Sequence, residues 1–289
     1  MITAGWLSPA AQAAPFLASV SNFVVFGLAG GDVTINSATS ISGNVGYAAN
    51  VTSTTNQKVD SFTGGVFVHS TATFNYTPAT FAPSGGITVG GVANTQLNQA
   101  NADALAAAGI MAGLASTHAS LGNVVDNQNV AVNSLGALNV IPIASLKHKE
   151  DTFTITGGAN DVFVFNVAGN WDYDNSQIVL NGVNANNVFF NFLSAAAEIA
   201  IGKAGTVFQG TILAPQGSID YHNPASFTGR IIGLDINLHS DFNIAAPFDP
   251  PPPPSVPAPG SLVLFALGLL GLLVARSRHM CATMVLVSR

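Results

Sequence analysis

The segment Phe208-Gln209-Gly210-Thr211-Ile212 decides the predicted fold, because its pattern recurs 19 residues later as Phe227-Thr228-Gly229-Arg230-Ile231. The same order of apolar residue, any residue, glycine, any residue, apolar residue occurs at 41–45 and, 21 residues later, at 62–66. Side chains of a strand alternate sides, so the two apolar residues and the glycine point to the same side. A period of about 20 residues indicates one coil of a stacked structure. The pattern predicts a β-solenoid whose inward apolar side chains stack from coil to coil.

Strand signals fill most of the remaining chain. Short β-branched and aromatic runs, separated by Gly, Asn and Ser, occur for example at 23–26, 152–156, 162–167 and 188–192. Such closely spaced runs are typical of strands joined by short turns. The predicted fold class is therefore mainly β.

One segment departs from this pattern, from Asn94 to about Ser116. It is rich in alanine, and its apolar residues recur at helical spacing, which predicts one amphipathic helix. Asn94 or Thr95 is expected to cap the start of this helix. An apolar helix face needs a partner, so the helix is expected to lie along one side of the coils. The residues predicted to form the apolar face are Leu97, Ala104, Leu105, Ala108, Met111 and Leu114.

The composition excludes several classes of function. Only 8% of the 289 residues are charged, whereas roughly 25% is usual. Between Ala14 and Asp249, five basic residues stand against fourteen acidic ones, a net charge of −9, which argues against a nucleic-acid partner. The sole cysteine, Cys281, lies near the C-terminus, so the preceding residues form neither a disulfide nor a thiolate metal site.

The N-terminal residues indicate export. Ala11-Gln12-Ala13 forms an A-x-A cleavage pattern after a modest apolar stretch, although no basic residue precedes it. We therefore interpret residues 1–14 as the remnant of a signal peptide. The domain that remains outside is predicted to span residues 15–249.

The C-terminal residues carry a second export feature. A proline-rich linker, 250–260, precedes an apolar segment, 261–278, that ends with two arginines. Arginines stay on the cytoplasmic side of a membrane, which predicts a cytoplasmic tail at 279–289. The continuous apolar run of 262–275 is shorter than the about 20 residues that span a bilayer. It is therefore typical of a signal rather than of a permanent anchor.

This tail resembles a PEP-CTERM sorting signal, with Ala258 at the place where the motif's name has a glutamate. The resemblance implies sorting by an exosortase in a Gram-negative, exopolysaccharide-producing bacterium. It further implies transient anchoring in the inner membrane and release as a secreted or outer-surface protein. A plain short membrane helix is the alternative. The residues that carry the resemblance are Val256, Pro257, Ala258, Pro259, Arg276 and Arg278.

The domain before the tail resembles the bacterial ice-binding-like β-solenoids and the related surface domains called choice-of-anchor A. The resemblance rests on 41–46, the alanine-rich helix, 161–165, 187–190 and 208–215. It implies a discontinuous right-handed β-solenoid, in which N-terminal coils lie beside C-terminal ones and the helix lies alongside.

Threonines are the candidates for a binding face. Ice binding needs a flat, regular array of small polar and methyl groups on successive coils. Thr71 with Thr73 forms one outward pair, and Thr152, Thr154 and Thr156 form a triplet on one strand face. Thr206, Thr211 and Thr228 show no common register. Threonine is also a common strand former, so ordinary solvent-facing threonines are the alternative.

Two weaker patterns could bind cations. Asp172, Asp174 and Ser176 have the spacing of the first ligands of a calcium loop, but Gln177 and Val183 stand where that loop needs glycine and glutamate. An acidic turn is the simpler interpretation.

The second cation pattern involves histidines. Asp220 shares a strand side with His222, as does His239 with Asp241, and imidazole with carboxylate suits transition metals. Tyr221 and Asp220 would disturb a flat face if both lay on it. No cofactor is predicted.

No catalytic motif supports an enzyme. The chain has no Gly-x-Ser-x-Gly elbow, no His-Glu-x-x-His pair and no phosphate-binding Gly-Lys-Ser or Gly-Lys-Thr. Only Asp220 and Asp241 have the offset expected of paired acids on neighbouring coils. The sequence predicts a non-enzymatic, exported structural or adhesive protein whose partner is exopolysaccharide or a neighbouring cell. Ice binding is the alternative, and a polysaccharide-acting enzyme is a third and weaker one.

Overall fold

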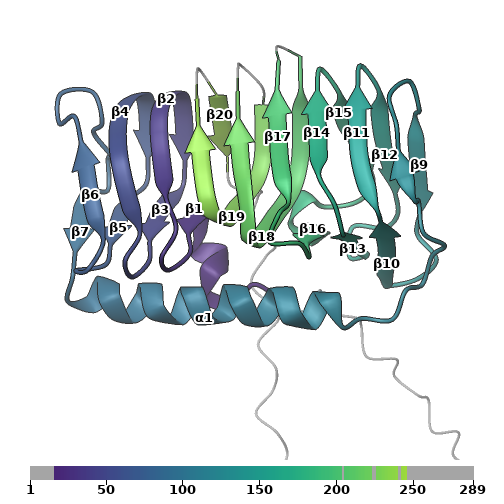
Figure 1. Ribbon diagram of the computed structural model, residues 1–289, viewed down its shortest axis with the longest axis horizontal. Helices are drawn as coiled ribbons and strands as arrows, with labels where there is room; N and C mark the ends of the chain where they lie inside the picture. Colours follow the sequence, from purple (N-terminus) through teal and green to yellow (C-terminus); the bar gives the residue numbers. More distant parts are fainter. Residues whose placement is uncertain (1–15, 204, 223–225, 240–241, 246–289) are drawn as a thin grey trace, which may run out of the picture. The chain divides into compact units, whose positions relative to one another are not determined.

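Parallel strands wind around one apolar interior in the computed structural model, which describes residues 16–203, 205–222, 226–239 and 242–245. The side chains of 54–57 and 242 are not described. Twenty strands belong to one parallel sheet that bends at corners and returns on itself (Figure 1). This is a mainly β, β-solenoid architecture, as predicted. The solenoid therefore has three faces: one covered by a helix, and two that differ in the charge of their outward side chains.

The first face lies beneath the single long helix of the described residues, α1 (Val92–Ala112), and we call it the helix face. In the order of the stack its strands are β7 (Ile87–Val89), β5 (Val66–Val68), β3 (Asn44–Tyr47), β1 (Phe23–Gly27), the middle of β19 (Ser226–Leu238), the middle of β18 (Val207–Tyr221), β16 (Val188–Phe192), β13 (Val162–Val167) and β10 (Leu138–Ile143). Its central strands, such as β1, β13 and β16, are buried on both sides, because the interior covers one side and α1 covers the other, whereas β7 at the end of the stack is partly exposed.

The second face carries most of the charged side chains, and we call it the charged face. It contains the last parts of β18 and β19 and the first parts of β2 and β4. Its strands, in stack order, are β6 (Thr73–Tyr76), β4 (Thr52–Thr63), β2 (Val33–Ser42), β19, β18, β17 (Glu198–Gly202), β14 (Trp171–Asp174), β11 (Ser145–Lys149) and β8 (Asn123–Val124).

The third face has no charged outward side chain in the segments that form it, and we call it the uncharged face. The segments, in stack order, are 61–63 of β4, 40–42 of β2, β20 (Phe242–Ala245), 226–228 of β19, 207–209 of β18, β15 (Gln177–Asn181), β12 (Thr152–Thr156) and β9 (Val130–Asn133).

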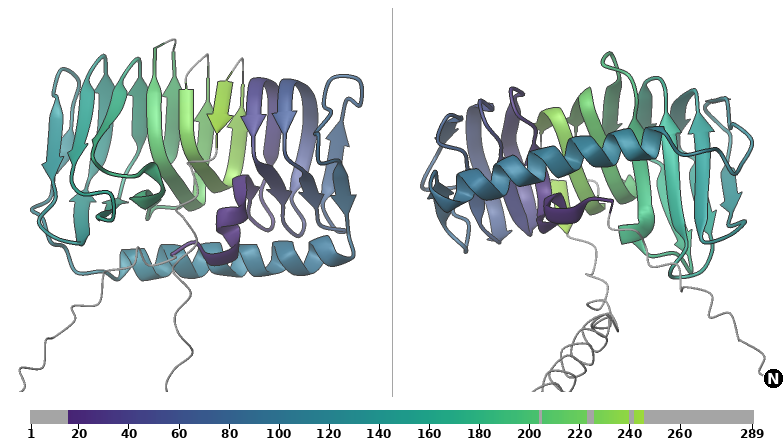
Figure 2. Two further views of the ribbon diagram at one scale, coloured as in Figure 1. Left: turned by 180° about the vertical axis from the view of Figure 1, so that it is seen from behind. Right: turned by 90° about the horizontal axis from the view of Figure 1, so that it is seen from below.

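The stack does not follow the order of the chain. Val25 of β1 pairs with Ile231 of β19, and Val33 of β2 pairs with Ile236 of the same strand. The N-terminal coils therefore continue the stack of the C-terminal coils, and α1 carries the chain from one end of the stack to the other (Figures 1 and 2). This arrangement confirms the predicted discontinuous solenoid.

The interior is built from the repeat that the sequence shows. Both apolar residues of all four repeat units are at most 6% exposed. Aromatic rings add to the stacking: Phe165 lies over Phe190 at 4.9 Å between centroids, and Phe208 over Phe227 at 4.6 Å. Parallel coils place equivalent residues side by side, so phenylalanines at equivalent positions of neighbouring coils stack in the interior.

Helix α1 differs in detail from the prediction of 94–116. It begins at Val92 after Gly91 and ends at Ala112 before Gly113, and Asn94 lies inside its first turn. Neither Asn94 nor Thr95 is the cap. The Asn94 side chain instead accepts a hydrogen bond from the Ser70 backbone N–H at 2.9 Å and donates one to Ser70 Oγ. It joins the helix to a turn of the neighbouring coil.

The buried stripe of α1 also differs from the predicted one. Leu105 is 48% exposed, whereas Ala100, Ala104 and Ala107 are fully buried. Alanines allow the helix to approach the sheet closely, so they form the contact and the larger Leu105 points outward. The buried residues are Ala93, Leu97, Ala100, Ala104, Ala107, Ala108 and Met111.

Two buried asparagines hold the end of the helix. Asn166 of β13 donates to the Met111 carbonyl at 2.8 Å, and Asn191 of β16 donates to the Ala108 carbonyl at 3.2 Å. Asn191 also donates to Asn166 Oδ1 at 2.9 Å. Met111 O also accepts the Leu114 N–H at 3.3 Å, so these amides add second hydrogen bonds that tie the last turn of α1 to the sheet beneath it.

Candidate functional site

The uncharged face is the first candidate binding surface. The sequences of its segments read SFT (61–63), SIS (40–42), NIA (243–245), SFT (226–228), VFQ (207–209), QIVLN (177–181), TFTIT (152–156) and VAVN (130–133). In the first seven segments the second residue points into the core and its neighbours point outward; in 130–133 the valines are buried and Ala131 and Asn133 point outward. The outward set consists of Ser, Thr, Asn, Gln, Ala and Val, with no charged and no aromatic side chain.

Hydrogen bonds fix several of these outward groups. Ser40 Oγ donates to Asn243 Oδ1 at 2.8 Å. Thr63 Oγ1 donates to Ser42 Oγ at 3.2 Å. Such contacts between coils hold hydroxyl and amide groups at set positions on the face. The nearby ion pair of Lys58 with Asp60, at 3.0 Å, lies earlier on β4, outside these segments.

The predicted threonine triplet lies on this face. Thr152, Thr154 and Thr156 alternate with the fully buried Phe153 and Ile155 along β12. Thr228 joins them from β19. Thr206 and Thr211 are buried, which explains why the sequence showed no common register for them.

The predicted pair Thr71 and Thr73 does not belong to the same surface. Both residues are exposed, but Thr73 begins β6 and pairs with Thr52, which places it on the charged face. Thr71 lies in the preceding turn, where its Oγ1 is 2.9 Å from His69 Nδ1. The five threonines therefore form no single binding face, because the chain turns a corner of the solenoid between the two sets.

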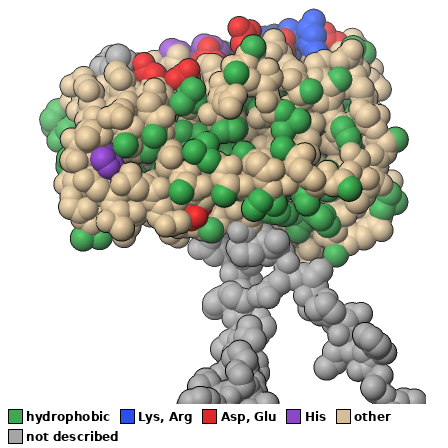
Figure 3. Space-filling view, turned by 60° about the horizontal axis from the view of Figure 1, so that its bottom comes forward, with side chains coloured by type: hydrophobic (Ala, Val, Ile, Leu, Met, Phe, Trp, Pro, Cys, Tyr) green, Lys and Arg blue, Asp and Glu red, His purple; other side chains and the backbone are tan. Residues whose placement is uncertain are grey.

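The charged face is the second candidate surface, and its charges occupy neighbouring coils. Figure 3 shows basic side chains, together with several acidic and histidine ones, along one rim of the molecule. Lys149 lies 3.3 Å from Asp172 and 3.7 Å from Asp174, and Lys203 lies 3.0 Å from Asp174. The hydrogen bond to Asp172 raises the pKa of the Lys149 ammonium.

These ion pairs argue against a calcium site at the predicted positions. Both aspartates of the pattern are neutralised by lysines, and Ser176 is buried with its Oγ donating to the His148 carbonyl at 3.0 Å. Both aspartates lie on β14, and Ser176 lies in the turn that follows it. The structure thus favours the simpler interpretation of an acidic turn within an ion-pair network.

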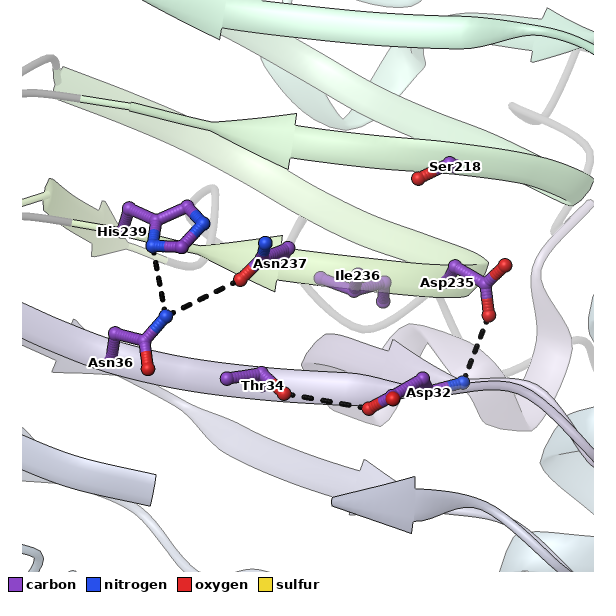
Figure 4. A pocket seen from close by; sticks show the side chains of 8 residues that line it. All are labelled: Asp32, Thr34, Asn36, Ser218, Asp235, Ile236, Asn237 and His239. Carbon is purple, nitrogen blue, oxygen red and sulfur yellow. Dashed lines mark hydrogen bonds between the residues drawn. The ribbon is translucent and has the colours of Figure 1, made fainter. Parts of the chain in front are cut away.

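A hollow of about 410 Å³ lies on the charged face where the two halves of the stack meet. Polar side chains from β2, β18 and β19 line it (Figure 4). The Asp32 backbone N–H donates to Asp235 Oδ1 at 3.0 Å, and the Asn36 amide lies 2.8 Å from His239 Nδ1. The lining residues are Asp32, Thr34, Asn36, Ser218, Asp235, Ile236, Asn237 and His239.

Sequence reasoning did not find this hollow. Thr34 pairs with Asn237, and the two residues are about 200 positions apart in the chain. No motif marks either strand, since the pairing depends on how the two halves of the stack join. The family resemblance implied the discontinuous topology, but the sequence did not predict the register in which β2 pairs with β19.

Beside the hollow, the structure brings Asp220, His222 and His239 together. Their potential ligand atoms all lie within 4.8 Å of one another. Tyr221, between the first two, is fully buried, so it cannot disturb any face, and burial raises the pKa of its hydroxyl. Asp241, the other predicted partner of His239, lies outside the described residues.

The predicted sorting signal also lies outside the described residues, including Val256 to Pro259, Arg276 and Arg278. Within the part of the chain that the structure describes, no helix is long and apolar enough to cross a membrane.

Comparison with solved structures supports the fold. An ice-binding protein from the Antarctic ascomycete Antarctomyces psychrotrophicus has a TM-score of 0.55 at 20% identity, covering 81% of this chain and 98% of that one. An ice-binding protein from an Antarctic bacterium, Flavobacteriaceae, has a TM-score of 0.56 at 21% identity, covering 81% and 47%. The DUF3494 domain of Shewanella frigidimarina ice-binding protein_1 has a TM-score of 0.53 at 18% identity, covering 81% and 97%. These likenesses show the fold.

Comparison with family models identifies both parts of the chain. Residues 255–278 match the PEP-CTERM protein-sorting motif, which indicates export and confirms the resemblance of the tail. A search among curated proteins finds no match. The Ice-binding-like model matches residues 27–242, about three quarters of the sequence, and the chain therefore belongs to the Ice-binding-like family.

Proposed function

We propose that this chain is an exported, non-enzymatic surface protein whose uncharged face binds ice. The observation that carries the proposal is the uncharged face itself: eight neighbouring β segments with small outward side chains and neither charge nor aromatic ring among them. The solved structures that resemble the fold are described as ice-binding proteins.

The geometry of a parallel solenoid suits a crystalline ligand. Neighbouring strands repeat at about 4.8 Å, and alternate residues along a strand at about 6.7 Å, so the outward groups form a two-dimensional grid. Hydroxyl and amide groups on this grid can hydrogen-bond ordered water, while Ala131, Val179 and Val207 offer apolar surface between them. Contacts such as Ser40 with Asn243 hold the polar groups in place before water orders on them.

A second candidate is the predicted adhesive role, in which the protein binds exopolysaccharide or a neighbouring cell. The hollow on the charged face favours it, because amide, carboxylate and hydroxyl groups converge there in a cavity of about 410 Å³. Sugar hydroxyls hydrogen-bond to groups of this kind. The two candidates use different faces, so substitutions can separate them.

The test uses the full chain and its inhibition of ice recrystallisation. Thr228→Tyr and Thr154→Tyr each place a ring on the uncharged face, and we expect at least a tenfold loss of inhibition. Thr73→Tyr is the matched control, because it adds the same ring to the charged face and should leave inhibition unchanged.

Three other outcomes would contradict parts of this proposal. A wild-type chain that shows no inhibition at high concentration contradicts ice binding. If the same chain sediments with the producer's exopolysaccharide, and Asn237→Ala but not Thr228→Tyr prevents this, the adhesive candidate replaces it. Release of reducing sugar from that polysaccharide would contradict the non-enzymatic proposal.

A further inference from the structure

Three potential metal ligands converge at the end of the charged face, next to the hollow. Asp220 is the second-last residue of β18, and His222, two residues after Asp220 and directly after the strand, points to the same side. His239 directly follows β19, whose Leu238 pairs with Tyr221. Pairing in parallel register therefore places His239 beside His222, with their rings stacked at 4.8 Å and 3° between planes.

The spacing of the ligand atoms is close to that of a coordination sphere. His222 Nε2 lies 2.9 Å from Asp220 Oδ2, and His239 Nε2 lies 3.7 Å from Asp220 Oδ1. Ligands at 2.0–2.2 Å around a tetrahedral Zn²⁺ are about 3.4 Å apart, which falls between these two distances. The ligand atoms of His222 and His239 are no more than 4.8 Å apart, so a common ion requires side-chain rotations that bring these two atoms closer.

The carboxylate has an oxygen without a hydrogen-bond partner. Asp220 Oδ1 is shielded from solvent and accepts no hydrogen bond, although it faces the imidazole of His239. Among the ion pairs of the described residues, those of Asp220 are with His222 and His239, whereas Asp172 and Asp174 are paired with lysines. A buried anionic oxygen without a donor is costly, and a cation at this point would satisfy it.

A neighbouring strand supplies an orienting group. The Asn36 amide nitrogen of β2 lies 2.8 Å from His239 Nδ1 and donates to Asn237 Oδ1 at 3.5 Å. An amide can turn by 180° and exchange its oxygen and nitrogen. With its oxygen toward Nδ1, Asn36 accepts the Nδ1–H and leaves the lone pair of Nε2 for a metal, which is the usual support of a metal-binding histidine.

We propose that Asp220, His222 and His239 bind one divalent transition-metal ion of the zinc and copper class. Two imidazoles and one carboxylate are a donor set that these ions prefer, and water completes the coordination. The ion joins β18 to β19 beside the hollow, and through Asn36 it is connected to the N-terminal half of the stack.

The test is a calorimetric titration of the full chain with Zn²⁺. His279 and Cys281 lie in the same chain, so the titration is made in a His279→Ala, Cys281→Ser background and with a histidine-free affinity tag. We expect one ion per chain. Asp220→Asn, His222→Ala and His239→Ala should each weaken binding at least tenfold, and Asn36→Ala by about tenfold, the effect of losing an outer partner.

His118→Ala is the matched control, because it removes a partly exposed imidazole far from the cluster along the chain, and it should leave Zn²⁺ affinity unchanged. Circular dichroism of each variant verifies its fold. Electron paramagnetic resonance of the Cu²⁺-loaded chain gives an independent measurement. It should report two bound imidazole nitrogens in the parent chain and one in His222→Ala or His239→Ala. Absent binding, or binding that the three ligand substitutions leave unchanged, would overturn the proposal.

Discussion

The repeat glycines lie at corners of the solenoid. Gly43, Gly64 and Gly210 have φ angles of +136°, +131° and +128°, a region that residues with a side chain rarely adopt. Each begins or crosses the bend between the uncharged face and the helix face. Coils stack so closely there that a Cβ on Gly64 would lie 2.2 Å from the Gly43 carbonyl oxygen.

Gly64→Ala should therefore destabilise the fold. Backbone strain and the clash with a neighbouring coil's carbonyl together should lower the free energy of unfolding by at least about 2 kcal/mol. Gly109→Ala is the matched control, since Gly109 lies in α1 with open space around it, and alanine should raise stability there by about 0.5–1 kcal/mol. Urea denaturation of both variants measures the difference. Equal effects of the two substitutions would contradict the corner role.

The sequence was sufficient to predict the direction of individual side chains within a strand. The pattern of Phe208, Gly210 and Ile212 predicted which side chains point inward, because a strand's period of two leaves no other choice. The partners of a residue on other coils were harder to predict. His222 and His239 meet only because β18 and β19 pair in one particular register, and one weak repeat did not fix that register.

At the scale of elements, buried alanines and two asparagine hydrogen bonds hold α1 against the sheet. Its buried stripe is mostly alanine, and the carbonyls of Ala108 and Met111 receive the amides of Asn191 and Asn166. The sequence predicted the helix from its periodicity. It could not show that Leu105 points outward, since both leucine and alanine count as apolar and only the close approach of the sheet selects alanine.

Ala104→Leu should test this close approach. A larger side chain at a fully buried position forces the helix from the sheet, and overpacking of this kind costs about 1–3 kcal/mol of unfolding free energy. Leu105→Ala, one position along, changes an exposed residue and should alter stability by no more than about 0.5 kcal/mol. Thermal unfolding followed by circular dichroism compares the two. A larger loss in Leu105→Ala would mean that the original prediction of the buried stripe was correct.

At the scale of the whole molecule, β19 joins the two halves. It pairs with β18 on one side and with β1, β2 and β20 on the other. The repeat and the helix predicted the separate parts of the solenoid, and the family resemblance supplied their discontinuous order. The hollow and the metal ligands arise at or beside this junction, so sequence patterns within either half could not reveal them.

Two truncations should show how much of the chain this junction supports. Removing residues 261–289 leaves every described strand in place, since the last of them, β20, ends at Ala245, so we expect a folded protein with an unchanged unfolding midpoint. Removing residues 226–289 also deletes β19 and β20, which exposes the unpaired edges of β18, β1 and β2 to solvent. The N-terminal coils then lose their neighbours, and because α1 spans both halves, we expect cooperative unfolding and aggregation of the whole chain. Circular dichroism and size-exclusion chromatography distinguish the two results. A shorter chain that stays monomeric with native strand content would show that the halves fold independently, and an aggregating longer one would assign the tail a structural role.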